Sequence, residues 1–338
     1  TKMAIKVNGT TVINDSRALT NIASVDATTV AALGAAGVGG SGIDGTLGTA
    51  QLTPVAGNFN KKGINWTGSE WITVGASGGF SASPDGLAWT QYNIGSSGGT
   101  TRTLENVIKF GSVYVCAGDN GFSTGGAYYK TSQGGNWSEA STGNTGAGLC
   151  VASSGSLVVM GFSGGNISTS TNGTSWTNRS VSSGGTERVN GIAYSPTLGR
   201  WVACDGGGGI LTSSNGTSWS RSQVGSASQT LNDVAWTGFD FQVVGASGAG
   251  WKSTNGTSWT ANNFPDTSTD YYAVTASGSY AIAIGYQGNC ATRTASNSTW
   301  KTSIAGNITT NVETIAASDD YIATTFTTKN VALYSALD

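Results

Sequence analysis

Aromatic side chains and acidic or amide side chains occur together in a few segments that the repeat pattern described below predicts to be loops. The most distinctive is residues 118–129, which contains Asp119, Asn120, Phe122, Tyr128 and Tyr129. Further candidates are Trp251, Asp270, Tyr271 and Tyr286. Flat aromatic faces suit the C–H groups of a sugar, and carboxylate and amide groups pair with its hydroxyls. These nine residues are the predicted ligand-binding residues and a glycan is the predicted ligand, the alternative being that the aromatic rings only pack against neighbouring loops.

Several kinds of chemistry are excluded by composition. The 338 residues contain no histidine, which removes histidine metal ligands, Ser-His-Asp triads and histidine pH switches. The net charge is −2, so a nucleic-acid partner is not predicted. The four cysteines, Cys116, Cys150, Cys204 and Cys290, form no CxxC pair and are predicted to be buried free thiols. No cofactor or metal site is predicted, and no apolar run is long enough for membrane insertion.

A seven-residue motif ending in tryptophan organises the rest of the chain. Ser170–Trp176 reads STNGTSW, and close copies are residues 213–219 and 253–259. A looser copy is residues 83–89, and degenerate copies are residues 131–137 and 294–300. The structural positions predicted from the repeat are Trp89, Trp137, Trp176, Trp219, Trp259 and Trp300, with Gly86, Gly134, Gly173, Gly216 and Gly256. Successive tryptophans are 39 to 48 residues apart, a period typical of β-propeller blades.

Each motif is predicted to be a hairpin. Asn-Gly or Asp-Gly between alternating residues favours a type I′ turn, in which both central residues have positive φ. The tryptophan begins the outgoing strand and is large enough to pack between neighbouring sheets. Two more strand-like runs precede each hairpin, as in residues 191–195 and 200–204. Each unit is therefore predicted to be a four-stranded antiparallel blade.

The number of blades follows from the two ends of the repeat region. A seventh unit begins at Val312 and reaches Asp338 before a tryptophan strand is complete. Residues 53–58 (TPVAGN) align with residues 302–307 (TSIAGN), the outer strand of unit six. We therefore expect residues 51–58 to supply the fourth strand of the last blade and remove its free edge. The predicted fold is an all-β, seven-bladed β-propeller over residues 50–338.

Residues 1–49 are predicted to be an anchoring and oligomerisation segment. Residues 4–13 form a strand–Asn-Gly–strand pattern, and residues 33–49 read as a glycine-rich linker. A lone hairpin is marginally stable, so we expect partner proteins to order this segment. The run from Ile5 to Ile13, followed by residues 16–22 (SRALTNI), resembles the opening segment of tailed-bacteriophage fibre and virion proteins.

That resemblance implies a tail-fibre-type virion protein, made in the host cytoplasm and exposed on the particle. Residues 1–49 would dock to other virion proteins, with a homotrimer as one assembly, and the propeller would attach to a host-surface glycan. Three alternatives stay open: a structural component such as a capsid decoration or tail adaptor protein, a cellular assembly scaffold, and a glycoside hydrolase.

The tryptophan hairpins are similar to the Asp-box repeats of sialidase-like propellers, although they are one residue shorter and mostly carry asparagine. The resemblance implies a fold and leaves activity open. A sialidase-like reaction would need clustered arginines beside a Tyr–Glu pair and an acidic residue. Only Arg102, Arg188 and Arg293 are expected on the variable face, opposite the Asn-Gly turns, with Glu105 and Glu187 near two of them. We therefore expect the protein not to be an enzyme.

Overall fold

Short runs rich in β-branched and aromatic residues form strands throughout the described chain. The computed structural model describes residues 5–7, 10–13, 51–54, 59–92, 102–119, 126–144, 146–182, 187–304, 311–326 and 330–335. By the proximity of its Cα atoms the chain divides into residues 1–40 and residues 41–338. In the first unit, β1 (Ile5–Val7) and β2 (Thr10–Ile13) pair antiparallel, as the Asn-Gly pattern predicts. The predicted boundary near residue 49 stays a prediction.

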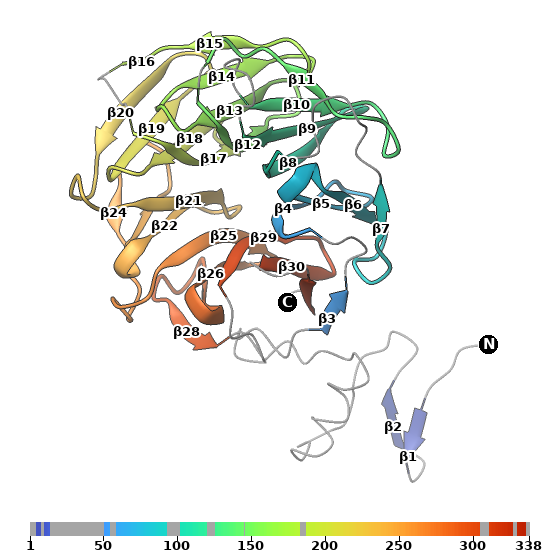
Figure 1. The fold of residues 1–338 in the computed structure, drawn as a ribbon. Coiled ribbons are helices and arrows are strands. Elements are labelled where there is room, and N and C mark those ends of the chain that lie inside the picture. The colour runs from blue at the N-terminus through green and yellow to red at the C-terminus, as the bar shows by residue number, and fades with distance from the viewer. Residues whose placement is uncertain are drawn as a thin grey trace. The chain divides into compact units, whose positions relative to one another are not determined.

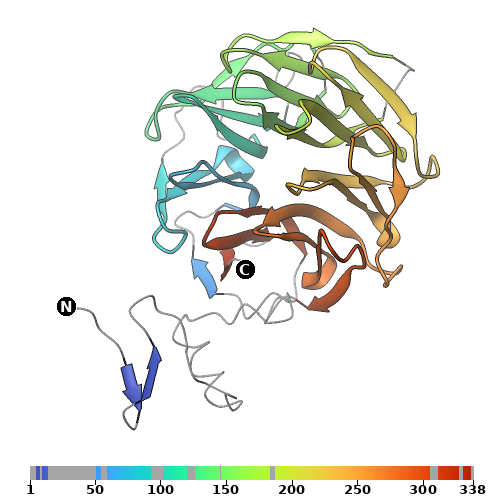
Figure 2. The ribbon, with the colours of Figure 1, turned by 180° about the vertical axis from the view of Figure 1, so that it is seen from behind.

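The second unit is a seven-bladed β-propeller, so the predicted fold is confirmed. Figures 1 and 2 show its blades around one central axis. Blade one contains β4 (Lys61–Trp66), β5 (Trp71–Gly75), β6 (Phe80–Ser83) and β7 (Thr90–Tyr92). Blade two contains β8 (Leu104–Phe110), β9 (Val113–Gly118), β10 (Ala127–Lys130) and β11 (Ser138–Ala140). Blade three contains β12 (Gly148–Ser153), β13 (Val158–Phe162), β14 (Ile167–Ser170) and β15 (Thr177–Arg179).

The remaining blades repeat this antiparallel order from the axis outward. Blade four contains β17 (Val189–Ser195), β18 (Arg200–Asp205), β19 (Gly209–Ser213) and β20 (Trp219–Gln223), and the short β16 (Val181–Ser182) adds a parallel fifth strand. Blade five contains β21 (Leu231–Trp236), β22 (Phe241–Gly245), β23 (Gly250–Ser253) and β24 (Thr260–Ala261). Blade six contains β25 (Tyr271–Ser277), β26 (Tyr280–Gly285), β27 (Asn289–Thr294) and β28 (Lys301–Ile304).

Blade seven joins the two ends of the repeat region. Its strands are β29 (Val312–Ala317), β30 (Tyr321–Phe326), β31 (Asn330–Ser335) and β3 (Gln51–Pro54). β3 pairs antiparallel with β31, placing Thr53 opposite Val331, and Figure 1 shows it beside the C-terminal strands. The predicted closure by an N-terminal strand is confirmed. Residues 55–58, also predicted for this strand, lie outside the described residues.

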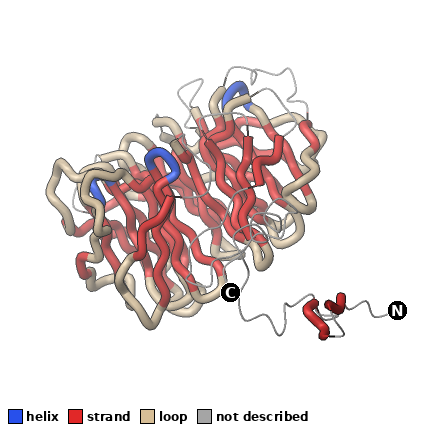
Figure 3. The backbone as a smooth tube through the Cα atoms, turned by 90° about the horizontal axis from the view of Figure 1, so that it is seen from below, coloured by secondary structure: helices blue, strands red, loops and turns tan. Residues whose placement is uncertain are grey.

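Strand connections divide the propeller into two faces. The first and second strands, and the third and fourth strands, join on one face, which we call the turn face. The second and third strands, and successive blades, join on the other, which we call the loop face. Three 3-10 turns lie on the loop face, as Figure 3 shows: η1 (Ala76–Gly78), η2 (Ala246–Gly248) and η3 (Tyr286–Gly288). Among the described residues, no helix is long and apolar enough to span a bilayer.

The core lies between the blades. Seven apolar clusters each combine residues of two neighbouring blades. Each repeat tryptophan packs between neighbouring blades, as predicted, and its partner is the preceding blade; Trp219, for example, joins Val159 and Trp201 between blades three and four. Trp89, Trp137, Trp219 and Trp300 are buried, whereas Trp176 and Trp259 are half-buried. The four cysteines are buried free thiols, as predicted.

The tryptophan hairpins turn by a different geometry from the one predicted. Ser170 Oγ accepts hydrogen bonds from the backbone N–H groups of Asn172 and Gly173 at 3.3 and 2.8 Å. Asn172 Oδ1 accepts from the N–H groups of Thr174 and Ser175 at 2.9 and 2.8 Å. Only the glycine has positive φ, 76° at Gly173, so the prediction of a type I′ turn is wrong. The serine and asparagine side chains therefore stabilise the turn by accepting hydrogen bonds from its backbone N–H groups.

Glycine is needed in these turns for two reasons. At Gly216 the φ of 73° lies in the left-handed region, which is unfavourable for residues other than glycine. A Cβ there would also stand 2.6 Å from Leu157 Cδ2 of the preceding blade. The same positive φ occurs at Gly86, Gly173 and Gly256, with values of 76°, 76° and 72°.

Blade two departs from this frame. Lys130 pairs with Tyr114 in the register that Ser213 and Trp201 occupy in blade four. Its Nζ donates to the carbonyl of Gln133 at 2.7 Å and lies 3.5 Å from the centroid of Phe80. The structural equivalent of the motif serine is therefore Lys130, and the predicted alignment on Thr131 is wrong. Gly134, predicted as a repeat glycine, has no left-handed φ, because this turn is one residue longer.

Candidate functional site

Every innermost strand has a β-bulge at its second residue. In blade one, for example, Lys61 pairs with Gly75 and Gly63 with Val74, leaving Lys62 as the extra residue. A bulge leaves one residue outside the ladder and redirects its side chain. The same shift occurs in all seven blades. The extra residues, which we call the bulge residues, are Lys62, Glu105, Leu149, Asn190, Asn232, Tyr272 and Glu313.

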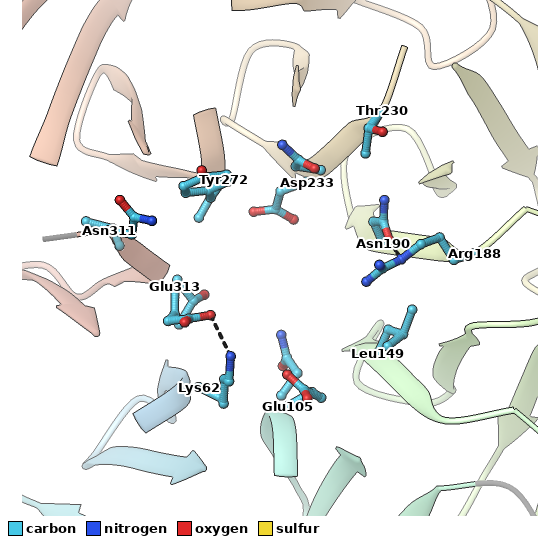
Figure 4. A pocket seen from close by; sticks show the side chains of 15 residues that line it. Lys62, Glu105, Leu149, Arg188, Asn190, Thr230, Asp233, Tyr272, Asn311 and Glu313 are labelled. Atoms are coloured by element: carbon cyan, nitrogen blue, oxygen red, sulfur yellow. Dashed lines mark hydrogen bonds and ion pairs between the residues drawn. The ribbon is translucent and has the colours of Figure 1, made fainter. Parts of the chain in front are cut away.

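All seven bulge residues line one cavity of about 360 Å³ at the centre of the loop face, which we call the central cavity. Arg188, Asp233 and Asn311 also line it. Figure 4 shows Leu149 and Tyr272 on opposite sides of the hollow, with polar groups between them. Seven strands that are far apart in sequence thus bring two apolar side chains and a set of charged and amide groups around one space.

Hydrogen bonds between neighbouring blades hold part of this lining in place. Asn190 Nδ2 donates to the carbonyl of Leu231 at 2.7 Å, and Asn232 Nδ2 donates to that of Tyr271 at 2.8 Å. Lys62 Nζ forms an ion pair with Glu313 at 3.0 Å across the junction of blades one and seven, drawn in Figure 4. These contacts make the lining a preorganised surface, which lowers the entropic cost of binding.

Two carboxyl groups of the cavity have raised pKa values. Burial raises the pKa of Glu105, and the carboxylates of Asp119 and Glu313 add to this effect, which Lys62 and Arg188 oppose. Burial also raises the pKa of Asp233 to about 7, against the backbone N–H groups of Val274 and Val234 that donate to it at 2.9 and 2.8 Å. Near neutral pH Asp233 is therefore able both to donate and to accept hydrogen bonds.

Asp233 also marks the inner end of the cavity. It lines a second cavity of about 420 Å³ together with Asn106 and Thr314, and these three residues line both cavities. The second cavity continues toward the turn face, where Asn65, Thr67 and Ser153 line it. The two cavities thus follow one another along the propeller axis and meet at Asn106, Asp233 and Thr314.

The structure distributes the predicted ligand-binding residues of blade two differently from the prediction. Tyr128 and Tyr129 lie in β10, so their predicted placement in a loop is wrong. Tyr128 is 5% exposed, packs between blades one and two, and donates its hydroxyl to the carbonyl of Asp119. Asp119 Oδ2 accepts from the N–H of Thr103 at 3.2 Å. Asn120 and Phe122 lie outside the described residues.

The predicted residues of blades five and six separate into buried and exposed groups. Tyr271 is 1% exposed and stacks on Phe264 at 3.7 Å, so it belongs to the core, and the next residue, Tyr272, faces the cavity instead. Trp251 is half-buried between blades four and five. Asp270 accepts from the N–H of Ser247 at 2.8 Å on the loop face, and Tyr286 is 44% exposed. The predicted ligand-binding role of these four residues stays a prediction.

Among the arginines expected on the variable face, Arg188 lines the central cavity and donates to Asn190 Oδ1 at 2.7 Å. Arg293 does not reach that face. It is 4% exposed and pairs at 3.0 Å with Asp240, which precedes β22 on the turn face, so its predicted position is wrong. No group of three or more His, Cys, Asp and Glu residues is placed to hold a metal within the described ranges.

Sequence reasoning missed most of the cavity lining. Lys62, Leu149, Asn190, Asn232 and Glu313 lie at the second position of the innermost strands, which the tryptophan motif does not mark. These residues can be identified by their position in the strand. The residue before each one is buried, and the residue after it pairs again with the second strand of the blade. Aligning the first strands of the seven units would have placed these residues in one column.

Comparison with known proteins shows the fold and no family. No family model matches the sequence, and no curated protein matches it. Among solved structures, a catalytically inactive histidine-to-alanine variant of virginiamycin B lyase from Staphylococcus aureus, with quinupristin, is similar with a TM-score of 0.73 at 10% identity, over 85% of this chain and 99% of that chain. YCF48 bound to a D1 peptide has a TM-score of 0.68 at 15% identity, over 85% and 94%. The WD40 propeller of Doa1 has a TM-score of 0.66 at 12% identity, over 86% and 97%.

Proposed function

We propose that this protein is a virion attachment protein of the tailed-phage type, whose propeller binds a host-surface glycan in the central cavity. Residues 1–49 would dock to other virion proteins and the propeller would be displayed outward. The observation that carries the binding proposal is the convergence of all seven bulge residues on one cavity. Concave, preformed sites with a few convergent polar groups are typical binding sites.

The lining suits a sugar better than an apolar ligand. A pyranose has apolar C–H faces and a rim of hydroxyl groups. Tyr272 and Leu149, on opposite sides of the cavity, offer apolar contact to the faces. Glu105 and Asp233 accept hydrogen bonds from hydroxyls, and Arg188 donates to them. Weak single-site binding of this kind becomes strong attachment when many copies act together on one particle.

The lack of histidine and the positions of two arginines support a role without catalysis. The virginiamycin B lyase variant that lacks one histidine is inactive, and this chain contains no histidine, which supports a role other than that lyase reaction. Two of the three arginines expected to cluster in a sialidase-like site lie apart, because Arg293 is buried toward the turn face while Arg188 lines the cavity.

An array of bacterial surface oligosaccharides tests the proposal. The labelled full-length protein should bind a subset of the array, and Glu105→Gln and Tyr272→Ala should each lower that binding at least tenfold. Leu198→Ala, an exposed position in the turn between β17 and β18, is the matched control and should leave binding unchanged. Circular dichroism would establish that all variants are folded. Absence of binding across the array, or equal binding by all variants, would refute the proposal.

A further inference from the structure

The loop that carries Tyr286 has a strained backbone that recurs on the loop face. Ser77, Ser247 and Gln287 have φ values of 56°, 54° and 51°, and each is the central residue of one of the turns η1, η2 and η3. Positive φ is unfavourable for residues other than glycine and persists where the surroundings fix it. The three turns share the pattern Gly-x-x-Gly, so the positive φ of the central residue is a recurrent feature of this type of loop.

Hydrogen bonds fix the Tyr286 loop to blades six and seven. The N–H of Tyr286 donates to the carbonyl of Asp270 at 2.9 Å. The N–H of Gln287 donates to Asn311 Oδ1 at 3.3 Å, and Asn289 Nδ2 donates to the carbonyl of Tyr286 at 2.8 Å. Tyr286 is 44% exposed, yet its backbone is held by hydrogen bonds on both sides. An exposed aromatic residue on a backbone that is already ordered requires less ordering on binding than one on a mobile loop.

Tyr286 lies at the rim of the central cavity. Asn311 lines the cavity, and its Oδ1 accepts a hydrogen bond from the N–H of Gln287 in the Tyr286 loop. The turn η3, which carries Tyr286, contacts β29, whose Glu313 also lines the cavity. Within the described ranges, the other exposed large apolar side chains are Leu87 and Leu198, both in turns of the turn face. Tyr286 is therefore the exposed large apolar side chain on the described part of the loop face.

We propose that Tyr286 forms a second subsite, so that the protein binds an oligosaccharide of at least two sugar units. One unit occupies the central cavity, and the next stacks its C–H face on Tyr286. Gln287, the next residue, is also exposed, and its side-chain amide offers a donor and an acceptor on the same loop. This inference rests on the proposed glycan function and adds to it the minimum length of the ligand and the direction in which it leaves the cavity.

A length series separates this inference from the parent proposal. The array carries each bacterial oligosaccharide sequence at one, two and four sugar units, and binding is measured for wild type, Tyr286→Ala, Tyr286→Trp and Leu198→Ala. In the wild type, two-unit probes should bind about three- to tenfold more tightly than one-unit probes, the increment expected of one stacking contact. Tyr286→Ala should remove that increment and leave one-unit binding unchanged. Tyr286→Trp and Leu198→Ala should retain it.

The outcomes are distinct. If Tyr272→Ala abolishes binding but Tyr286→Ala leaves the length dependence intact, the second subsite is refuted and the proposed function stands. Equal loss of one-unit and two-unit binding in Tyr286→Ala also refutes the second subsite, because the residue would then act on the cavity itself. If no saccharide binds at any length, both proposals are refuted.

Discussion

Trp219 and Trp176 occupy the same position in successive repeats but differ in burial and in hydrogen bonding. Trp219 is 2% exposed, and its Nε1 donates to the carbonyl of Gly216 at 2.9 Å. Trp176 is half-buried, but its Nε1 is buried without a hydrogen-bond partner. Replacement by alanine and by phenylalanine at both positions therefore separates the contribution of the ring from that of the indole N–H.

The expected magnitudes follow from these differences. Trp219→Ala should lower the free energy of unfolding by about 3–5 kcal/mol, because it leaves a cavity between two blades. Trp176→Ala should cost roughly half as much, since part of that ring is already exposed. Trp219→Phe should cost about 1–2 kcal/mol, because it removes a hydrogen bond and leaves the Gly216 carbonyl unpaired. Trp176→Phe should be near neutral, since it removes an unpaired buried N–H along with some contact area.

Urea unfolding monitored by both circular dichroism and fluorescence measures these values and tests whether the transition is two-state. The decisive quantity is the difference between the two phenylalanine variants. If Trp176→Phe costs as much as Trp219→Phe, the indole hydrogen bond of Trp219 contributes no measurable stability, contrary to the expected difference. If Trp219→Ala costs less than about 1 kcal/mol, the tryptophans do not hold the blades together.

Two further predictions concern closure and charge. Deletion of residues 50–58 should lower the melting temperature far more than deletion of residues 1–45, because β3 completes blade seven; equal melting curves would contradict closure. Burial lowers the pKa of Lys130 from 10.5 to about 7. Between these two pH values the unfolded chain therefore binds more protons than the folded protein. The free energy of unfolding of the wild type should rise as the pH increases from 7 to 10. Lys130→Met should flatten that rise and be more stable than wild type at pH 6, as measured by urea unfolding at each pH; parallel pH profiles would contradict the assignment.

The fold was predictable because its signals are local and repeated. Serine, asparagine or aspartate, glycine and tryptophan recur at fixed spacing, and each copy specifies a hairpin without reference to the others. The closing strand was predictable from the likeness of residues 53–58 to the outer strand of blade six. The turn type was mispredicted because an Asn-Gly pair is compatible with more than one turn conformation. Hydrogen bonds to the serine and asparagine side chains stabilise the conformation in which only the glycine has positive φ.

The site depended on information that no single repeat contains. Tyr271 and Tyr272 are adjacent and equal in type, yet the bulge sends Tyr272 to the central cavity and leaves Tyr271 stacked on Phe264 in the core. A shift of one residue reverses the face that a strand side chain occupies, so aromatic identity alone could not separate them.

The number of blades, their strand order and the pairing of the first and last strands of the repeat region could be predicted, because hairpins and strand pairing are specified by short patterns. The shared cavity of Lys62, Glu105, Leu149 and the other bulge residues becomes visible only in the folded propeller. The physical reason is that closing the ring brings together residues about 40 positions apart, and the axis they surround exists only when all seven blades are in place.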